Sequence, residues 1–110
     1  MEVSANIRRQ RRLRIRLKGE TIAVLVTGDV PGMTQEVYAG MVGALRDSIR
    51  NSKGFISHAG GPVTGGWRVV EIWETEADAN RWFDENVRPN LPAGAQPNRR
   101  IEPLRTVIKA

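Results

Sequence analysis

The sequence predicts one α+β domain whose strands and helices follow the order β-α-β-β-α-β. Two segments repeat apolar residues at helical spacing, one after Thr34 and one after Thr75. Four shorter runs rich in β-branched and aromatic residues are typical of strands: 21–28, 55–60, 67–74 and 101–108. A chain of 110 residues that is 40% hydrophobic can close one modest core. The sequence contains no internal repeat, so we expect a single domain.

The first strand and the first helix follow one another closely. "TIAVLVTG", residues 21–28, is nearly all apolar, which suggests burial on both faces. Pro31-Gly32 then marks a turn, and Thr34 is a suitable N-cap with Glu36 in the first helical turn. "NSKG" ends the helix at Gly54, which can adopt a left-handed conformation. The apolar positions at helical spacing are Val37, Tyr38, Met41, Val42, Leu45 and Ile49.

The second and third strands lead into the second helix. "FISHAG", residues 55–60, and "WRVVEIWE", residues 67–74, flank the flexible connection "GPVTGG". The third strand runs directly into "TEAD", where Thr75 and Asp78 have the spacing of a capping box. Pro89 is expected to end this helix. Its predicted inward positions are Ala79, Trp82, Phe83 and Val87.

The last segment completes the sheet. "NLPAGAQPN" is expected to be a loop, and "IEPLRTVI", residues 101–108, a final strand. Pro103 lacks a backbone donor, so it should lie at an edge or a bulge. The resulting order is that of a ferredoxin-like sandwich, in which both helices cover one face of the sheet.

The uncovered face of such a sheet also carries apolar side chains. "IAVLV" and "RVVEI" place them on both faces, and a chain of this length cannot cover both. We therefore expect a homodimer that packs sheet against sheet. Arg68, on the face opposite Trp67, would need an acidic partner if the interface buried it.

Residues 1–20 form a basic N-terminal extension that carries the whole charge excess. They hold seven basic and two acidic residues, whereas residues 21–110 hold ten of each. Three interpretations stay open: an accessory segment or a true start site further downstream, an edge strand, or an arm for nucleic acid or a membrane surface. The strand reading rests on alternation, because Leu13, Ile15 and Leu17 fall on one side and the basic residues on the other.

Several function classes lack their signals. The chain has no cysteine and one histidine, so it offers neither a thiolate nucleophile nor a metal-ligand cluster. It contains no phosphate-binding glycine loop that opens a helix and no nucleophile elbow. The body has no basic face and no nucleic-acid motif, so nucleic acid is not an expected partner. With no membrane span and no secretory signal, we expect a cytoplasmic protein that needs no cofactor or metal.

The stretch "GWRVVEIWETEADANRWFDENVRPNL", preceded by "GFISHAGGP", resembles the antibiotic biosynthesis monooxygenases of the dimeric α/β-barrel superfamily. The resemblance covers residues 21–110 and implies a dimeric α/β barrel formed by two ferredoxin-like chains. The "WE-T/S-E-A" junction of strand and helix is typical of the superfamily and not of one reaction. Its members include cofactor-free quinone-forming monooxygenases, haem-degrading enzymes and small isomerases, so the fold does not decide the function.

Haem degradation can be tested residue by residue within this resemblance. Haem-degrading members carry an asparagine on the first strand, a tryptophan before the strand-to-helix junction and a histidine on the second helix. Trp73 matches the tryptophan, but the first strand has no asparagine and the second helix has no histidine. We therefore do not expect haem degradation of that type.

His58 and Glu71 are the candidate catalytic residues. His58 is the one histidine of the chain, and its ordinary pKa permits proton transfer near neutral pH. If the hairpin closes between Gly60 and Trp67, His58 faces Val69, and Glu71 becomes its diagonal neighbour on the same face. A slip of one residue would separate the two side chains. The alternative is structural, with His58 bonded to a neighbour and Glu71 paired with an arginine.

The aromatic residues supply candidate ligand contacts. Trp67 and Trp73 share the face of His58 by the period of the strand, and Tyr38 should lie on the inner side of the first helix. Each also has a structural reading, in which Trp73 joins helix to sheet. Trp82 and Phe83 are expected to be core residues.

These observations lead to one main function hypothesis and two others. The main one is a tailoring enzyme that binds a small apolar, aromatic or polyketide-like metabolite, deprotonates it at His58 and lets it react directly with oxygen, as a cofactor-independent monooxygenase. The second is a non-enzymatic ligand-binding or interaction protein of the same fold. The third is a nucleic-acid binder that works through residues 1–20.

Overall fold

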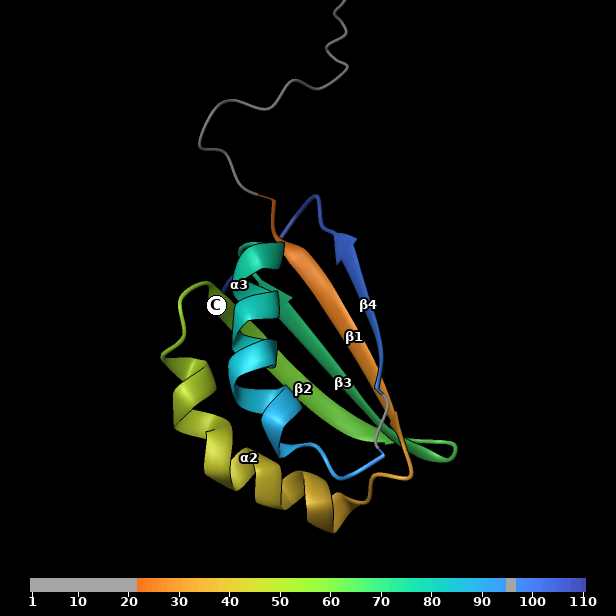
Figure 1. The fold of residues 1–110 in the computed structure, drawn as a ribbon. Helices are drawn as coiled ribbons and strands as arrows, with labels where there is room; N and C mark the ends of the chain where they lie inside the picture. Colours follow the sequence, from red (N-terminus) through yellow and green to blue (C-terminus); the bar gives the residue numbers. More distant parts are fainter. Residues whose placement is uncertain (1–21, 95–96) are drawn as a thin grey trace, which may run out of the picture.

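The computed structural model describes residues 22–94 and 97–110. The expected order of strands and helices is confirmed, and the four strands form one antiparallel sheet in the order β2-β3-β1-β4. Both helices lie on one face of this sheet, which gives the ferredoxin-like α+β arrangement (Figure 1). The elements are β1 (Val24–Pro31), α2 (Gln35–Arg50), β2 (Phe55–Val63), β3 (Gly66–Trp73), α3 (Glu76–Trp82), a π-helical turn (Phe83–Val87), a 3-10 turn (Arg88–Asn90) and β4 (Asn98–Pro103).

The basic extension and its possible strand from Leu13 to Leu17 lie outside the described residues. None of the described helices is long and apolar enough to cross a membrane.

Both helices begin where the sequence predicts. The side chain of Thr34 accepts a hydrogen bond from the Val37 N–H, and that of Thr75 accepts one from the Asp78 N–H. These bonds satisfy backbone donors that a helix leaves unpaired in its first turn. Asp78 is buried at this turn, and its carboxylate accepts a hydrogen bond from Arg81 at 2.6 Å.

The last strand differs from its prediction. It spans Asn98–Pro103 and not 101–108, because Arg99 and Ile101 pair with Gly28 and Val26 of β1. The expected loop therefore ends earlier than its composition suggests. Pro103 is the last residue of this edge strand, a position compatible with its missing N–H, and the chain beyond it is irregular.

The hairpin between β2 and β3 is tighter than predicted. Val63 pairs with Gly66, so Thr64 and Gly65 form the turn, and Gly65 adopts a positive φ of 79°. Both strands extend into the segment that we expected to be a flexible connection. The register is consequently shifted by two residues, and His58 lies directly opposite Glu71 and not opposite Val69. A shift of two keeps His58 and the residues after it on their expected faces. An irregularity between Phe55 and Ser57 changes the alternation at the start of β2, so Phe55 pairs with Trp73 and faces inward.

The core lies between the helices and the end of the sheet at which α3 begins. Trp73 has no exposed surface and packs edge-on against Phe55, with ring centroids 5.5 Å apart. The Trp82 ring lies 6.1 Å from Trp73, which joins α3 to β3. The remaining buried members of this cluster are Val24, Val26, Ile49 and Ala79. Trp82 is thus a core residue as expected, whereas Phe83 is only partly buried.

The opposite face of the sheet has no described helix over it. Leu25, Val70 and Ile72 point to this face and are half-buried. Arg68 lies there too and forms two hydrogen bonds to the Asp29 carboxylate, at 2.7 and 2.9 Å. The acidic partner that Arg68 was expected to need is therefore supplied by β1 of the same chain.

Replacing Thr75 by alanine should lower the free energy of unfolding by about 1 kcal/mol, because α3 loses the side chain that caps its first turn. Thr64→Ala, in the exposed hairpin turn, is the matched control and should change it by less than about 0.5 kcal/mol. Urea unfolding followed by circular dichroism measures both. Equal losses in the two variants would contradict a stabilising role for this cap.

Candidate active site

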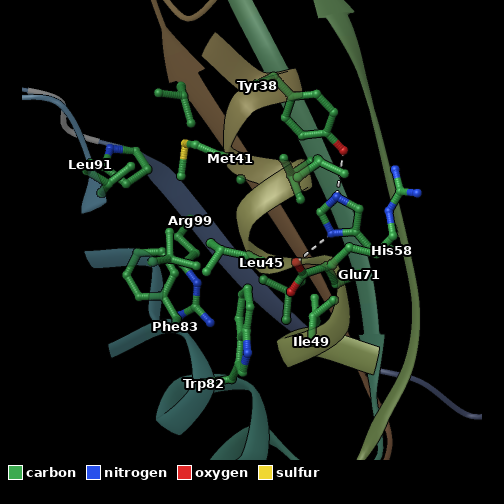
Figure 2. Close-up of a pocket in the computed structure, with 18 of the residues that line it drawn as sticks. Tyr38, Met41, Leu45, Ile49, His58, Glu71, Trp82, Phe83, Leu91 and Arg99 are labelled. Atoms are coloured by element: carbon green, nitrogen blue, oxygen red, sulfur yellow. Dashed lines mark hydrogen bonds and ion pairs between the residues drawn. The ribbon is translucent and has the colours of Figure 1, made fainter. Parts of the chain in front are cut away.

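A cavity of about 400 Å³ lies between the sheet, α2 and the turns that follow α3. Figure 2 shows Met41, Leu45 and Ile49 of α2 facing Trp82, Phe83 and Leu91 across it. Most of the lining is apolar, and this size and character are typical of small-molecule sites. The polar or charged side chains at its wall are those of Tyr38, Arg46, Arg50, His58, Glu71 and Arg99.

Three of these polar residues form a hydrogen-bonded chain. His58 Nδ1 lies 2.8 Å from Glu71 Oε2, and His58 Nε2 lies 2.6 Å from the Tyr38 hydroxyl oxygen (Figure 2). His58 comes from β2, Glu71 from β3 and Tyr38 from α2. The His58 and Glu71 side chains are 24% and 10% exposed, so the pair is largely withdrawn from water.

A fourth residue extends the chain into the core. The Trp73 Nε1–H donates a hydrogen bond to Glu71 Oε1 at 2.8 Å. An ionised Glu71 accepts from Trp73 with one oxygen and from the His58 Nδ1–H with the other. His58 Nε2 is then an acceptor, and the Tyr38 hydroxyl donates to it. The two bonds to the buried carboxylate therefore orient a proton-accepting nitrogen toward Tyr38.

Tyr38 is held in place by aromatic neighbours and by a glycine. Its ring lies 4.9 Å from that of Trp67 and 6.0 Å from that of His58, nearly parallel to the latter. A Cβ at Gly60 would overlap the Tyr38 hydroxyl, so a glycine is needed for the phenol to reach His58. Burial, and to a lesser degree the negative charge of Glu71, raise the pKa of Tyr38 above its ordinary value.

The predicted site residues divide into two groups. His58, Glu71 and Tyr38 are brought together at the cavity wall. Trp67 and Trp73 lie behind this wall and not among the residues that line it. Trp73 is enclosed in the core and contacts Glu71, while Trp67 is buried beneath Tyr38 with no partner for its Nε1–H among the described residues. Both indoles support the polar chain and do not reach the cavity directly.

Arg99 and Phe83 are among the lining residues that the sequence did not mark as site residues. Arg99 was assigned to the last residues before the predicted strand, and Phe83 was expected to be core. In the structure Arg99 lies on β4, and its guanidinium stands 4.3 Å from the centroid of the Phe83 ring. Alternation of Arg99 with Ile101, extended back from the predicted strand, would have placed Arg99 on the inner face.

No protein-family model and no curated protein matches the chain. Among solved structures, it is similar to the crystal structure of a putative monooxygenase from Shewanella loihica PV-4. The TM-score is 0.55 with 21% sequence identity, over 84% of this chain and 100% of that chain. At this identity the similarity shows a shared fold.

Spectrophotometric titration can test the coupling of Tyr38 to Glu71, because Tyr38 is the only tyrosine of the chain. The wild-type midpoint should lie above the ordinary 10.0. Glu71→Gln removes a negative charge, which makes the phenolate easier to form, so the midpoint should fall while burial keeps it raised. Glu74→Gln, exposed just beyond β3, is the control and should leave it unchanged. The coupling is refuted if both variants titrate like wild type.

Proposed function

We propose that this protein is a tailoring enzyme that acts on a small aromatic or polyketide-like metabolite as a cofactor-independent monooxygenase. The observation that carries the proposal is the Tyr38–His58–Glu71 chain at the wall of an apolar cavity. A monooxygenase of this kind needs a base beside a dry site for an electron-rich ring. The likeness to a putative monooxygenase adds support at the level of the fold.

The proposed reaction begins with removal of a phenolic proton. Tyr38 Oη accepts the proton from the substrate hydroxyl while it passes its own proton to His58 Nε2. The imidazolium that forms is stabilised by the Glu71 carboxylate at Nδ1. Burial and the charge of Glu71 raise the pKa of Tyr38, which disfavours a phenolate at this position and suits a hydroxyl that passes the proton on. His58 is thus the base, Glu71 stabilises its charged form, and Tyr38 relays the proton.

Deprotonation makes the ring electron-rich enough to react directly with oxygen. A phenol and one O₂ then yield a quinone and one water, so the atoms balance without a further reductant. The apolar lining contributes by keeping water away from the reacting carbon. The protein supplies orientation, proton transfer and a low-dielectric cavity.

A non-enzymatic ligand-binding role is the second candidate, and one observation favours it. Both ring nitrogens of His58 already have partners, so its hydrogen bonds are complete without a substrate. Such a closed network can be purely structural. The two functions differ in whether His58 is needed for turnover or only for the fold.

His58→Ala should reduce oxygen uptake about tenfold or more with a substrate drawn from a panel of hydroxynaphthalenes and hydroxyanthracenes. Tyr38→Phe should cause a comparable loss, because the relay oxygen is removed while the ring remains. Ser57→Ala, exposed beside His58, is the control and should retain full activity. Full turnover in folded His58→Ala would remove His58 from the mechanism and favour the binding role.

We also propose that the active protein is a homodimer. Leu25, Val70 and Ile72 lie on a sheet face over which no described helix packs. Burying this face against a second copy would remove apolar surface from water, which is the main favourable contribution to protein association. The Asp29–Arg68 ion pair on the same face would help to fix how the two copies are oriented relative to each other.

Sedimentation equilibrium should give twice the chain mass of 12.2 kDa for the wild type. Ile72→Arg places a charge in the proposed interface and should weaken the dimer at least about tenfold. Val37→Arg, at a residue 43% exposed on α2, is the control and should remain dimeric. A wild-type monomer at micromolar concentration would contradict the dimer.

A further inference from the structure

Arg99 is a cation fixed at the cavity wall by groups of its own chain. Its Nη1 donates to the Asn80 side-chain oxygen at 2.8 Å, and its Nη2 donates to the Ala79 carbonyl at 3.4 Å. The Phe83 ring lies against the guanidinium, 4.3 Å from centroid to carbon. A side chain held from three directions is preorganised, so little rotamer entropy remains to be lost when a ligand binds.

The guanidinium retains donors for a ligand. An arginine carries five N–H groups, and the described residues use two of those on Arg99. The Nε–H and one N–H on each Nη form no hydrogen bond with the described residues. Paired N–H donors in one plane match the two oxygens of a carboxylate, which is the preferred partner of arginine.

The charge balance of the wall also favours an anion. Its charged lining residues are three arginines, Arg46, Arg50 and Arg99, against one carboxylate, Glu71. Glu71 is engaged by His58 and Trp73, and no described carboxylate forms an ion pair with Arg99. Burial lowers the pKa of Arg99, opposed in part by the charges of Glu71, Asp84 and Glu76. An anion bound beside the guanidinium would compensate its partly buried positive charge directly.

The register of the sheet provides room beside this cation. One row across the sheet reads Gly60, Val69, Gly28 and Arg99, and these positions face the helices. Gly28 lines the cavity, and a Cβ built on it would meet nothing within 4 Å. The cavity wall next to Arg99 is therefore the backbone of Gly28, with no side chain to occupy the space above it.

Arg99 and His58 lie on the two edge strands of the sheet, β4 and β2. Three strand spacings, roughly 14 Å, separate the two strands, and both side chains line the cavity (Figure 2). A ligand that extends from Arg99 to Tyr38 would span the cavity, which suits a fused-ring molecule.

We propose that the cavity recognises an aromatic acid, whose carboxylate binds the Arg99 guanidinium while its ring system lies over Gly28 and against Phe83. This inference rests on the ligand-binding part of the proposed function and adds the substrate class. The acid group anchors one end of the ligand, and the hydroxyl to be deprotonated reaches Tyr38 at the other.

A displacement assay tests this assignment without requiring turnover. The reporter is N-phenyl-1-naphthylamine, a neutral dye whose fluorescence rises in apolar sites. It is displaced from the full chain by 1-naphthoate or by 1-naphthalenemethanol, which share a ring system and differ in charge. In wild type the acid should displace the dye at about tenfold lower concentration, the value of one good charge-assisted hydrogen bond. Gly28→Leu fills the floor and should abolish dye binding.

Arg99→Gln should remove the preference for the acid and leave the affinity for the alcohol within about twofold, since only the charged contact is lost. Arg100→Gln removes the same charge from the exposed neighbour and should keep the preference. The wild-type comparison decides the matter even if Arg99→Gln does not fold, because equal displacement by acid and alcohol overturns the inference. Dye that binds without any acid preference leaves the cavity and the His58 mechanism standing. Dye that binds equally to Gly28→Leu overturns both the acid site and the proposed ligand cavity.

Discussion

The carboxylate of Glu71 joins the core of this protein to its candidate active site. A buried carboxylate is costly unless it is hydrogen-bonded, and both its oxygens are satisfied, by the Trp73 Nε1–H and by His58 Nδ1 at 2.8 Å each. Trp73 is the most enclosed side chain of the core, and His58 faces the cavity. The bond from Trp73 fixes the carboxylate, and the carboxylate fixes the imidazole. Packing in the core therefore determines where the imidazole of His58 points.

The cavity lies along the middle of α2, between two places where this helix packs against aromatic and core residues. At one end Tyr38 rests on Trp67 and over Gly60. At the other end Ile49 joins the cluster around Trp73 and Trp82. Met41, Val42 and Leu45 between them face the cavity, and opposite them the floor carries a glycine at position 28. The π-helical turn after α3 completes the wall with Phe83 and Val87.

The polar side chains that we assign to the site lie in two groups, toward opposite edges of the sheet. Tyr38, His58 and Glu71 form the hydrogen-bonded chain that we propose as a proton relay, toward the β2 edge, while Arg99 supplies positive charge at the β4 edge. Fused aromatic rings would bridge the two over apolar side chains. This separation places the base away from the cation, whose nearby charge would otherwise disfavour protonation of the imidazole.

The sequence by itself determined the local features of this fold: the helix starts at Thr34 and Thr75, and the common face of His58 and Glu71. Capping and the strand period of two act within a few residues, so both can be read from spacing. The tertiary structure decided what depends on distant pairing. Gly65 closed a tight turn that moved the register by two residues, and pairing with β1 began β4 at Asn98, which turned Arg99 inward. Trp73 faced inward as expected, but packing against Phe55 and Trp82 enclosed it behind the cavity wall. Residues far apart in the sequence decide which of the inward side chains reach a cavity, so spacing alone does not reveal it.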